Sequence, residues 1–312
     1  MAKVAIIDLG TNTFHLLVAE TGGSEPYRIL HRSHEAAKIG RGGINQGIIT
    51  DAAFQRAVDA MSKFATAIKE YDVESVHAFA TSAIRSAVNG KALAQAIEHQ
   101  TGIPVQIIPG DREAELIFHG IKTALDLGST TNLIVDIGAG SVEFIIGNSD
   151  GVLWKRSFEI GGQRLLERFM KHDPITAEEI RSLDEYFHET LGPLKEMIKQ
   201  YNPRVLVGSS GSFDTWSEIY CERNGIVYDH NAPETPLTLE GFYELYHELI
   251  VKDRTQRMNI RGMIEMRVDM IVVASCLIRH LLEYHPFDSM RVSTYSLKEG
   301  ALALIAGSQT TP

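Results

Sequence analysis

Two stretches of the chain carry the same arrangement of polar residues. The first, DLGTNTFHLLV, begins at Asp8, and the second, DIGAGSVEFII, begins at Asp136. In both, a carboxylate ends an apolar run and glycine and small polar residues follow. Glycine allows positive φ and close backbone approach to a ligand, and consecutive N–H groups in such a turn form an anion-binding concavity. A carboxylate repels a phosphate unless a cation lies between them, and Mg²⁺ suits that position.

Aligning the stretches gives two sets of candidate phosphate-binding residues. The sets are Gly10, Thr11, Asn12 and Thr13 in the first stretch, and Gly138, Ala139, Gly140 and Ser141 in the second. Asp8 and Asp136 are matching candidate metal ligands, and His15 stands where Glu143 stands. A turn in which the aspartate caps its own loop would explain one copy. Two copies, each opening one half of the chain, favour a functional role. The P-loop and Rossmann glycine patterns are not supported.

The predicted elements around these stretches repeat as well. Each stretch lies in a predicted β-hairpin, with strands at 4–8 and 14–19 in the first half and at 133–136 and 142–146 in the second. A third strand follows in each half, near 27–30 and 153–157, and strands then alternate with helices. This order is typical of an α/β fold, and a repeat of this length predicts two similar domains that face each other.

Composition narrows the classes of protein. The chain has 312 residues and a formal charge of −10, which argues against general duplex-DNA or membrane-surface binding. No apolar run is long enough for a membrane helix, and the start lacks a signal-peptide pattern, so we expect a cytoplasmic protein. Two groups of basic residues could still line a path for a polyanion, or could be scattered surface charges. They are His31, Arg32, Lys38 and Arg41, and Lys155, Arg156 and Arg164.

The chain resembles a known family in six strings that occur in the family's order. The strings are IDLGTNTFHLLV, TSAIRSAVNG, IIPGDREAELIF, VDIGAGSVEFIIG, VGSSGS and SLKEGAL. The family is the exopolyphosphatase and guanosine pentaphosphate phosphohydrolase (Ppx/GppA phosphatase) family of the actin-like ATPase superfamily, in its short two-domain form. The resemblance implies two facing actin-like (ribonuclease H-like) domains, with an active-site cleft between them. We expect the domains at 1–125 and 126–297, with a last helix, about 298–312, that packs back on the first.

The resemblance also implies roles for single residues. Glu113 matches the family's catalytic glutamate, although a first-turn acid of a helix capped by Asp111 would also explain it. Glu143 is implied as a second catalytic and metal-positioning carboxylate, beside the metal ligands Asp8 and Asp136. Further implied phosphate contacts are His15, Arg85, Gly208, Ser209, Ser210 and Gly211. Several positions depart from the family pattern, among them Arg112, Ala139 and Tyr295.

These observations lead to one expected function and several alternatives. We expect a Mg²⁺-dependent (or other divalent-cation-dependent) exopolyphosphatase that hydrolyses the terminal phosphoanhydride of inorganic polyphosphate. The alternative substrate is guanosine pentaphosphate. An actin-fold kinase that uses ATP, and a catalytically silent sensor of polyphosphate or an alarmone, remain as rival hypotheses. The family resemblance further implies a homodimer, and no DNA or membrane partner.

Overall fold

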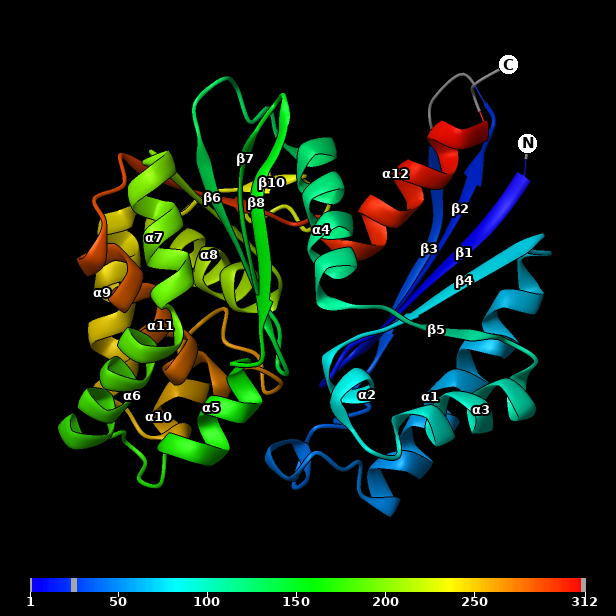
Figure 1. The fold of residues 1–312 in the computed structure, drawn as a ribbon, viewed down its shortest axis with the longest axis horizontal. Coiled ribbons are helices and arrows are strands. Elements are labelled where there is room, and N and C mark those ends of the chain that lie inside the picture. Colours follow the sequence, from blue (N-terminus) through cyan, green and yellow to red (C-terminus); the bar gives the residue numbers. More distant parts are fainter. Residues whose placement is uncertain (1, 24–26, 310–312) are drawn as a thin grey trace. The chain divides into compact units, whose positions relative to one another are not determined.

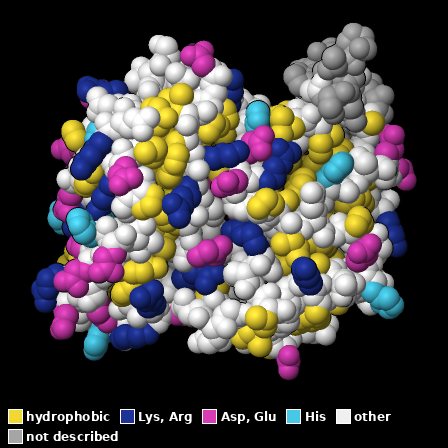
Figure 2. Space-filling view, viewed as in Figure 1, with side chains coloured by type: hydrophobic (Ala, Val, Ile, Leu, Met, Phe, Trp, Pro, Cys, Tyr) yellow, Lys and Arg dark blue, Asp and Glu magenta, His cyan; other side chains and the backbone are white. Residues whose placement is uncertain are grey.

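The computed structural model describes residues 2–23 and 27–309, and the chain divides into two compact units (Figure 1). The first unit consists of two segments, one that extends to Thr123 and one that begins at Leu297. The second unit is Ala124–Ser296. No helix in the described ranges is long and apolar enough to cross a membrane. Figure 2 shows acidic and basic side chains interspersed over the face that it presents.

The first unit is built on a five-stranded sheet with the order β3-β2-β1-β4-β5. Its strands are β1 (Ala2–Leu9), β2 (Phe14–Thr21), β3 (Tyr27–Glu35), β4 (Ser75–Ala80) and β5 (Val105–Ile107). The first three pair antiparallel, and β4 and β5 continue the sheet in parallel to β1. Its helices are α1 (Asp51–Glu70), α2 (Ser82–Ser86), α3 (Gly90–Thr101), α4 (Gly110–Ala124) and α12 (Leu297–Gln309), with a 3-10 turn at Ile44–Gln46.

Residues of β1 alternate between the two faces of this sheet. Ala5 and Ile7 belong to the core formed with α1 and α3, whereas Val4 and Ile6 are buried outside that cluster. Helix α12 packs against β1 and β2. It also crosses α4 closely, because a Cβ at Gly300 would lie 1.8 Å from the carbonyl oxygen of Leu116. The glycine of the SLKEGAL string therefore permits the contact with the helix that carries Glu113.

The second unit repeats this plan in a sheet with the order β10-β11-β9-β6-β7-β8. Its strands are β6 (Asn132–Ile137), β7 (Val142–Asn148), β8 (Gly151–Phe158), β9 (Val205–Ser209), β10 (Glu234–Thr235) and β11 (Ser289–Ser293). Its helices are α5 (Gly162–Phe169), α6 (Ala177–Thr190), α7 (Gly192–Tyr201), α8 (Gly211–Asn224), α9 (Leu239–Val251), α10 (Arg254–Met258) and α11 (Met270–Tyr284). Again three antiparallel strands, β6, β7 and β8, are continued in parallel by β9 and β11.

The repeated strand order confirms the predicted actin-like α/β fold, with some differences in detail. Two helices follow β4, because residues 87–89 separate α2 from α3. Asn89 accepts there from the N–H of Ile49 and donates to its carbonyl. Helix α4 begins at Gly110, so Asp111 lies in the first turn and is not the cap. The predicted helical region at 237–285 contains three separate helices.

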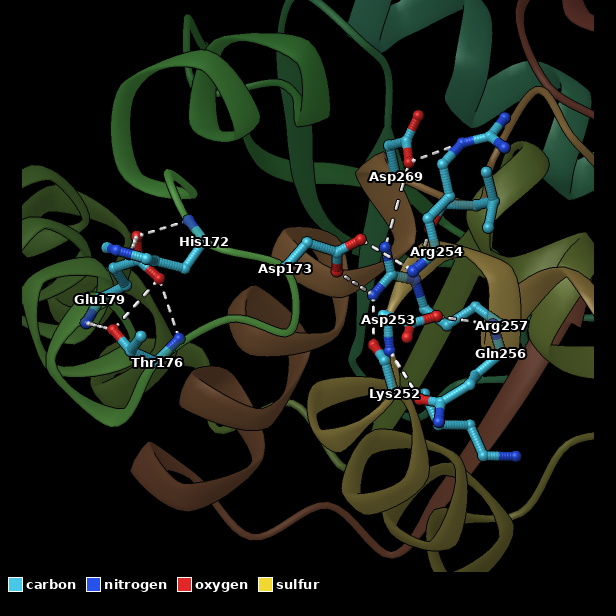
Figure 3. Close-up of polar contacts among 11 residues, drawn as sticks. His172, Asp173, Thr176, Glu179, Lys252, Asp253, Arg254, Gln256, Arg257 and Asp269 are labelled. Carbon is cyan, nitrogen blue, oxygen red and sulfur yellow. Dashed lines mark hydrogen bonds and ion pairs between the residues drawn. The ribbon is translucent and has the colours of Figure 1, made fainter.

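A buried arginine holds the segment before α6 to the region around α10 (Figure 3). Arg257 has 0% exposed surface, and it donates to a carboxylate oxygen of Asp173 at 2.7 Å and to the carbonyl of Val268 at 2.9 Å. Asp253 and Gln256 form a capping box at the start of the same short helix. A helix of only five residues has little stability of its own, so these contacts must supply it.

Glu179 organises the adjoining turn from the other side (Figure 3). It accepts hydrogen bonds from the backbone N–H groups of Lys171, His172 and Thr176. Burial would raise the pKa of this carboxyl, but the hydrogen bonds outweigh it and lower the pKa to about 2. The turn that leads from α5 into α6 is therefore fixed around an ionised glutamate.

We predict that Arg257→Met destabilises the protein by about 2–4 kcal/mol, because it removes several buried hydrogen bonds and leaves a buried carbonyl without its donor. Arg254→Met is the matched control, since Arg254 is 46% exposed and its ion pairs with Glu265 and Asp269 are at the surface. We expect the control to lose less than about 1 kcal/mol. Urea unfolding measures both variants, and equal losses would contradict this assignment.

Candidate active site

The sheet register explains why the two polar stretches match. Asp8 is paired with His15 across β1 and β2, and Asp136 is paired with Glu143 across β6 and β7. Directly opposed residues of an antiparallel pair lie on the same face of the sheet. Val142 and Phe144 belong to the core of the second unit, so Glu143 faces the other side, as its alternation predicts. His15 and Glu143 thus occupy equivalent positions, each beside the aspartate of its own unit.

The two loops that follow these aspartates have the same tight geometry. A Cβ at Gly10 would lie 2.8 Å from the carbonyl oxygen of Thr13, and a Cβ at Gly138 would lie 3.0 Å from that of Ser141. A side chain at either position would force the loop open. Glycine is therefore required at both places by the turn itself, before any ligand is considered.

Each loop is also held by the chain that returns after the third strand. In the first unit, the N–H of Lys38 donates to the carbonyl of Asn12 at 2.8 Å, and the N–H of Gly40 donates to that of Thr11 at 3.1 Å. In the second unit, the corresponding donors are the N–H groups of Gly161, Gly162 and Gln163, which bind the carbonyls of Gly140, Gly138 and Ala139. The backbone of both loops is therefore fixed in advance of binding.

The first loop carries a donor with no partner in the described part of the chain. Asn12 is 8% exposed, and its side-chain nitrogen is buried without a hydrogen bond. Leaving a buried amide donor unsatisfied costs about 1–3 kcal/mol. Such a cost persists at functional sites where a ligand completes the bonding. Since the nitrogen can only donate, the missing partner is an acceptor.

Asp136 is surrounded by hydroxyl donors. Ser210 lies 2.8 Å from both carboxylate oxygens, and Ser296 donates to Oδ2 at 2.6 Å. Ser210 has a φ of 73°, a backbone conformation that residues other than glycine rarely adopt. It is the single residue between the end of β9 and the start of α8. The strained backbone is what brings its hydroxyl to the aspartate.

Glu143 is held in a similar way. It is 1% exposed, and its Oε1 accepts from Ser141 at 2.7 Å and from Ser157 at 2.6 Å. Ser141 ends the second glycine loop, and Ser157 lies opposite Glu143 on β8. Four serine hydroxyls therefore surround two adjacent buried carboxylates, which otherwise repel each other.

Glu113 and Arg85 contact each other in the first unit. Glu113 is 7% exposed in the first turn of α4, and its Oε2 accepts from Arg85 at 2.6 Å. Arg85 follows β4 on the short helix α2 and also donates to the carbonyl of Ile108. A nearly buried carboxylate is stabilised in its charged form by such a pair. The sequence predicted Arg85 as a phosphate contact, and here it orients the candidate catalytic glutamate.

The predicted Gly-Ser loop divides into two parts. Gly208 lies within β9, where a Cβ would overlap the ring of Phe213 at 1.9 Å, and the hydroxyl of Ser209 donates to the carbonyl of Tyr295. These contacts account for both residues through packing. Ser210 and Gly211 form the turn into α8.

Arg267 is a residue of this site that sequence reasoning missed. A Cβ at Gly211 would lie 2.2–2.4 Å from the guanidinium of Arg267, so the arginine rests directly on that glycine. Burial lowers the pKa of Arg267, and the charges of Asp214 and Asp136 oppose that shift. Nothing in the sequence marks this arginine, because only the tertiary fold brings residue 267 to residue 211.

Most of the basic residues proposed for a polyanion path have local partners. Arg164 donates to the carbonyl of Gly140 at 2.8 Å and pairs with Glu159, and Arg32 lies 3.9 Å from Glu299. Lys38 is part of the segment that holds the first glycine loop. Arg164 and Lys38 are therefore the two members that the fold places at a phosphate-loop candidate.

The side chains in the described part of the chain do not form a complete metal-binding site by themselves. Among residues 2–23 and 27–309, no group of three or more His, Cys, Asp or Glu side chains could hold a metal ion. Asp136 and Glu143 supply two neighbouring carboxylates. Mg²⁺ is usually bound by one or two carboxylates together with water and substrate phosphates, so this donor set fits such an ion.

Known proteins match the chain over nearly its whole length. The crystal structure of an exopolyphosphatase from Cytophaga hutchinsonii is 42% identical, with a TM-score of 0.95 and 98% coverage of both chains. Exopolyphosphatase 2 of Mycobacterium tuberculosis is 30% identical over 98% of this chain and 99% of its own length. A guanosine-5'-triphosphate,3'-diphosphate pyrophosphatase of Photobacterium profundum is 28% identical over 95% of this chain, which spans 58% of that relative's length.

The model of the Ppx/GppA phosphatase family matches residues 17–308. This range includes the whole second unit and most of the first. It begins after the first glycine loop, so Asp8, the residues of that loop and His15 precede it. The chain belongs to the Ppx/GppA phosphatase family.

Proposed function

We propose that the chain is a metal-dependent exopolyphosphatase that releases orthophosphate from the end of inorganic polyphosphate. Proteins named exopolyphosphatase from Cytophaga hutchinsonii and Mycobacterium tuberculosis match it along both full lengths. Guanosine pentaphosphate is the second candidate substrate. It draws support from the relative of Photobacterium profundum, of which the chain spans only 58%.

The observation that carries the proposal is the buried side-chain amide of Asn12. It stands in a glycine loop whose backbone is already fixed, and no described residue accepts its hydrogen bond. A phosphate oxygen is an acceptor of the required kind. We assign the remaining phosphate contacts to Gly10, Thr11, Thr13, His15, Gly138, Ala139, Gly140, Ser141, Ser210 and Gly211.

In the second unit, Asp136 and Glu143 would hold the metal ion together with substrate oxygens and water. Asp8 is the corresponding candidate ligand of the first unit. When bound, it neutralises charge on the phosphate oxygens and holds them in place. The hydroxyls of Ser210 and Ser296 fix the orientation of Asp136. The carboxylate is thus positioned by groups that do not themselves bind a cation strongly.

Glu113 is proposed to orient and deprotonate the water that attacks the terminal phosphorus. Arg85 holds the glutamate at 2.6 Å, which keeps it charged and limits its rotation. The guanidinium of Arg85 has several N–H donors, so it can bind a phosphate while it still donates to Glu113. Hydrolysis of a phosphoanhydride requires mainly positioning and charge neutralisation from the protein. Glu113 would position the water, and Arg85 together with the metal ion would supply the positive charge.

We predict that Glu113→Gln lowers phosphate release from long-chain polyphosphate by about 10²–10⁴-fold, as expected for loss of a general base. Glu115→Gln is the matched control, since Glu115 lies on the same helix and forms a partly exposed ion pair with Arg112. Its rate should stay within about twofold. Equal rates for wild type and Glu113→Gln would remove Glu113 from the reaction.

The same assay separates the rival functions. Release of phosphate from guanosine pentaphosphate but not from polyphosphate would establish the alternative substrate. Tight binding of either polyanion without any release would favour the sensor. Transfer of phosphate from ATP to an acceptor, with no release from polyphosphate, would favour the kinase.

We predict that Asp136→Asn lowers activity by more than about 100-fold, since the carboxylate should serve a cation. Its effect on stability should be about 1–3 kcal/mol, because the hydroxyls of Ser210 and Ser296 lose a charged acceptor. In the wild type, Mg²⁺ should raise the melting temperature and EDTA should abolish activity. The Mg²⁺-dependent shift should disappear in Asp136→Asn and persist in the control Asp150→Asn, which changes an exposed turn residue. Unchanged Mg²⁺ binding in Asp136→Asn would contradict the metal assignment.

A further inference from the structure

Glu143 depends on two serines that occupy different kinds of structure. Both hydroxyls donate to the same oxygen, Oε1, from Ser141 at 2.7 Å and from Ser157 at 2.6 Å. The carboxylate is 1% exposed, so water cannot easily replace either donor. A buried carboxylate without donors is costly, and both serines therefore matter for its position.

The two donors differ in what else they can bind. Ser141 ends the glycine loop that is assigned to phosphate, whereas Ser157 lies within strand β8, one pair from the end of the β7–β8 ladder and directly opposite Glu143. A serine has one O–H to donate. Ser141 can give it to Glu143 or to a phosphate oxygen, but not to both. The strand position of Ser157 leaves its hydroxyl on Glu143.

We propose that Ser157 is the positioning residue of Glu143, which keeps this carboxylate in place while Ser141 turns its hydroxyl to the substrate phosphate. The proposal rests on the proposed function of the site. Ser157 itself touches neither substrate nor metal.

Loss of the Ser157 hydroxyl should therefore have two measurable effects. Ser141 becomes the remaining serine donor to Oε1, so its hydroxyl stays on Glu143 and KM for polyphosphate rises. Glu143 also loses a hydrogen bond that fixes its position, so kcat falls. Loss of one hydrogen bond to a charged group corresponds to a decrease in kcat/KM of about 10- to 100-fold.

The experiment compares Ser157→Thr with Ser157→Val. The two side chains have nearly the same shape, both suit a β-strand, and only threonine carries the hydroxyl. We expect Ser157→Thr to retain kcat/KM within about threefold and Ser157→Val to show the full loss, with a raised KM and a lowered kcat. Ser33→Ala is the control, since Ser33 lies in the equivalent strand β3 and contacts His31. It should leave all three quantities unchanged.

Glu143→Gln and Ser141→Ala complete the test. If Glu143→Gln is inactive while Ser157→Val has wild-type kcat/KM, KM and kcat, the positioning role is wrong and the proposed function stands. If Glu143→Gln is fully active, the catalytic role of Glu143 in the proposed function is wrong. Equal losses in the threonine and valine variants would show a packing effect and overturn the proposal. In a Ser141→Ala background, Ser157→Val should raise KM little further, because the shared hydroxyl is already absent.

Discussion

The structure of the second unit depends on two carboxylates buried side by side. Asp136 and Glu143 are 5% and 1% exposed and directly opposed across β6 and β7. Two such charges destabilise a sheet unless donors or a cation compensate them. Here the compensation comes from hydroxyls of the loop, of β8, of the turn after β9 and of the segment before α12. The need to stabilise the two carboxylates thus constrains the positions of four separate chain segments.

The first unit uses the same scaffold for different chemistry. His15 takes the place of the second carboxylate beside Asp8, and the residue opposite it on β3 is His34, whose ring lies 6.1 Å away. The candidate catalytic carboxylate of this unit is Glu113, which lies on helix α4 outside the sheet and is paired with Arg85. One loop is therefore flanked by groups that can become cationic, and the other by carboxylates. Duplication provided two equal loops, and substitution at one register position gave them different partners.

Much of this could be predicted from the sequence, because the informative patterns are local. Period-2 alternation and the repeated Asp-Gly loops gave the hairpins, and family strings gave Glu113, Arg85 and the Gly-Ser turn. The expectation of a phosphoanhydride hydrolase is confirmed at the level of the family. Contacts between distant segments could not be predicted. Arg267 reaches Gly211, and Ser296 reaches Asp136, only through tertiary packing. The position of Ser157 could have been predicted, since counting residues along β8 from the hairpin places it opposite Glu143.

The departures from the family pattern are accommodated by local contacts. Arg112 pairs with Glu115 at 3.0 Å, one turn along the same helix and away from the Arg85 contact. Ala139 is 7% exposed, and its carbonyl holds the N–H of Gln163.

At Tyr295 the backbone makes the contacts that hold the segment. Its carbonyl accepts from Ser209 and Ser293, and its N–H donates to Ser293. These bonds do not depend on which side chain stands there. The hypothesis of a silent sensor drew its support from these three substitutions. Each is accommodated by contacts that leave both glycine loops, the paired carboxylates and Glu113 in place, so they give no physical reason to expect lost turnover.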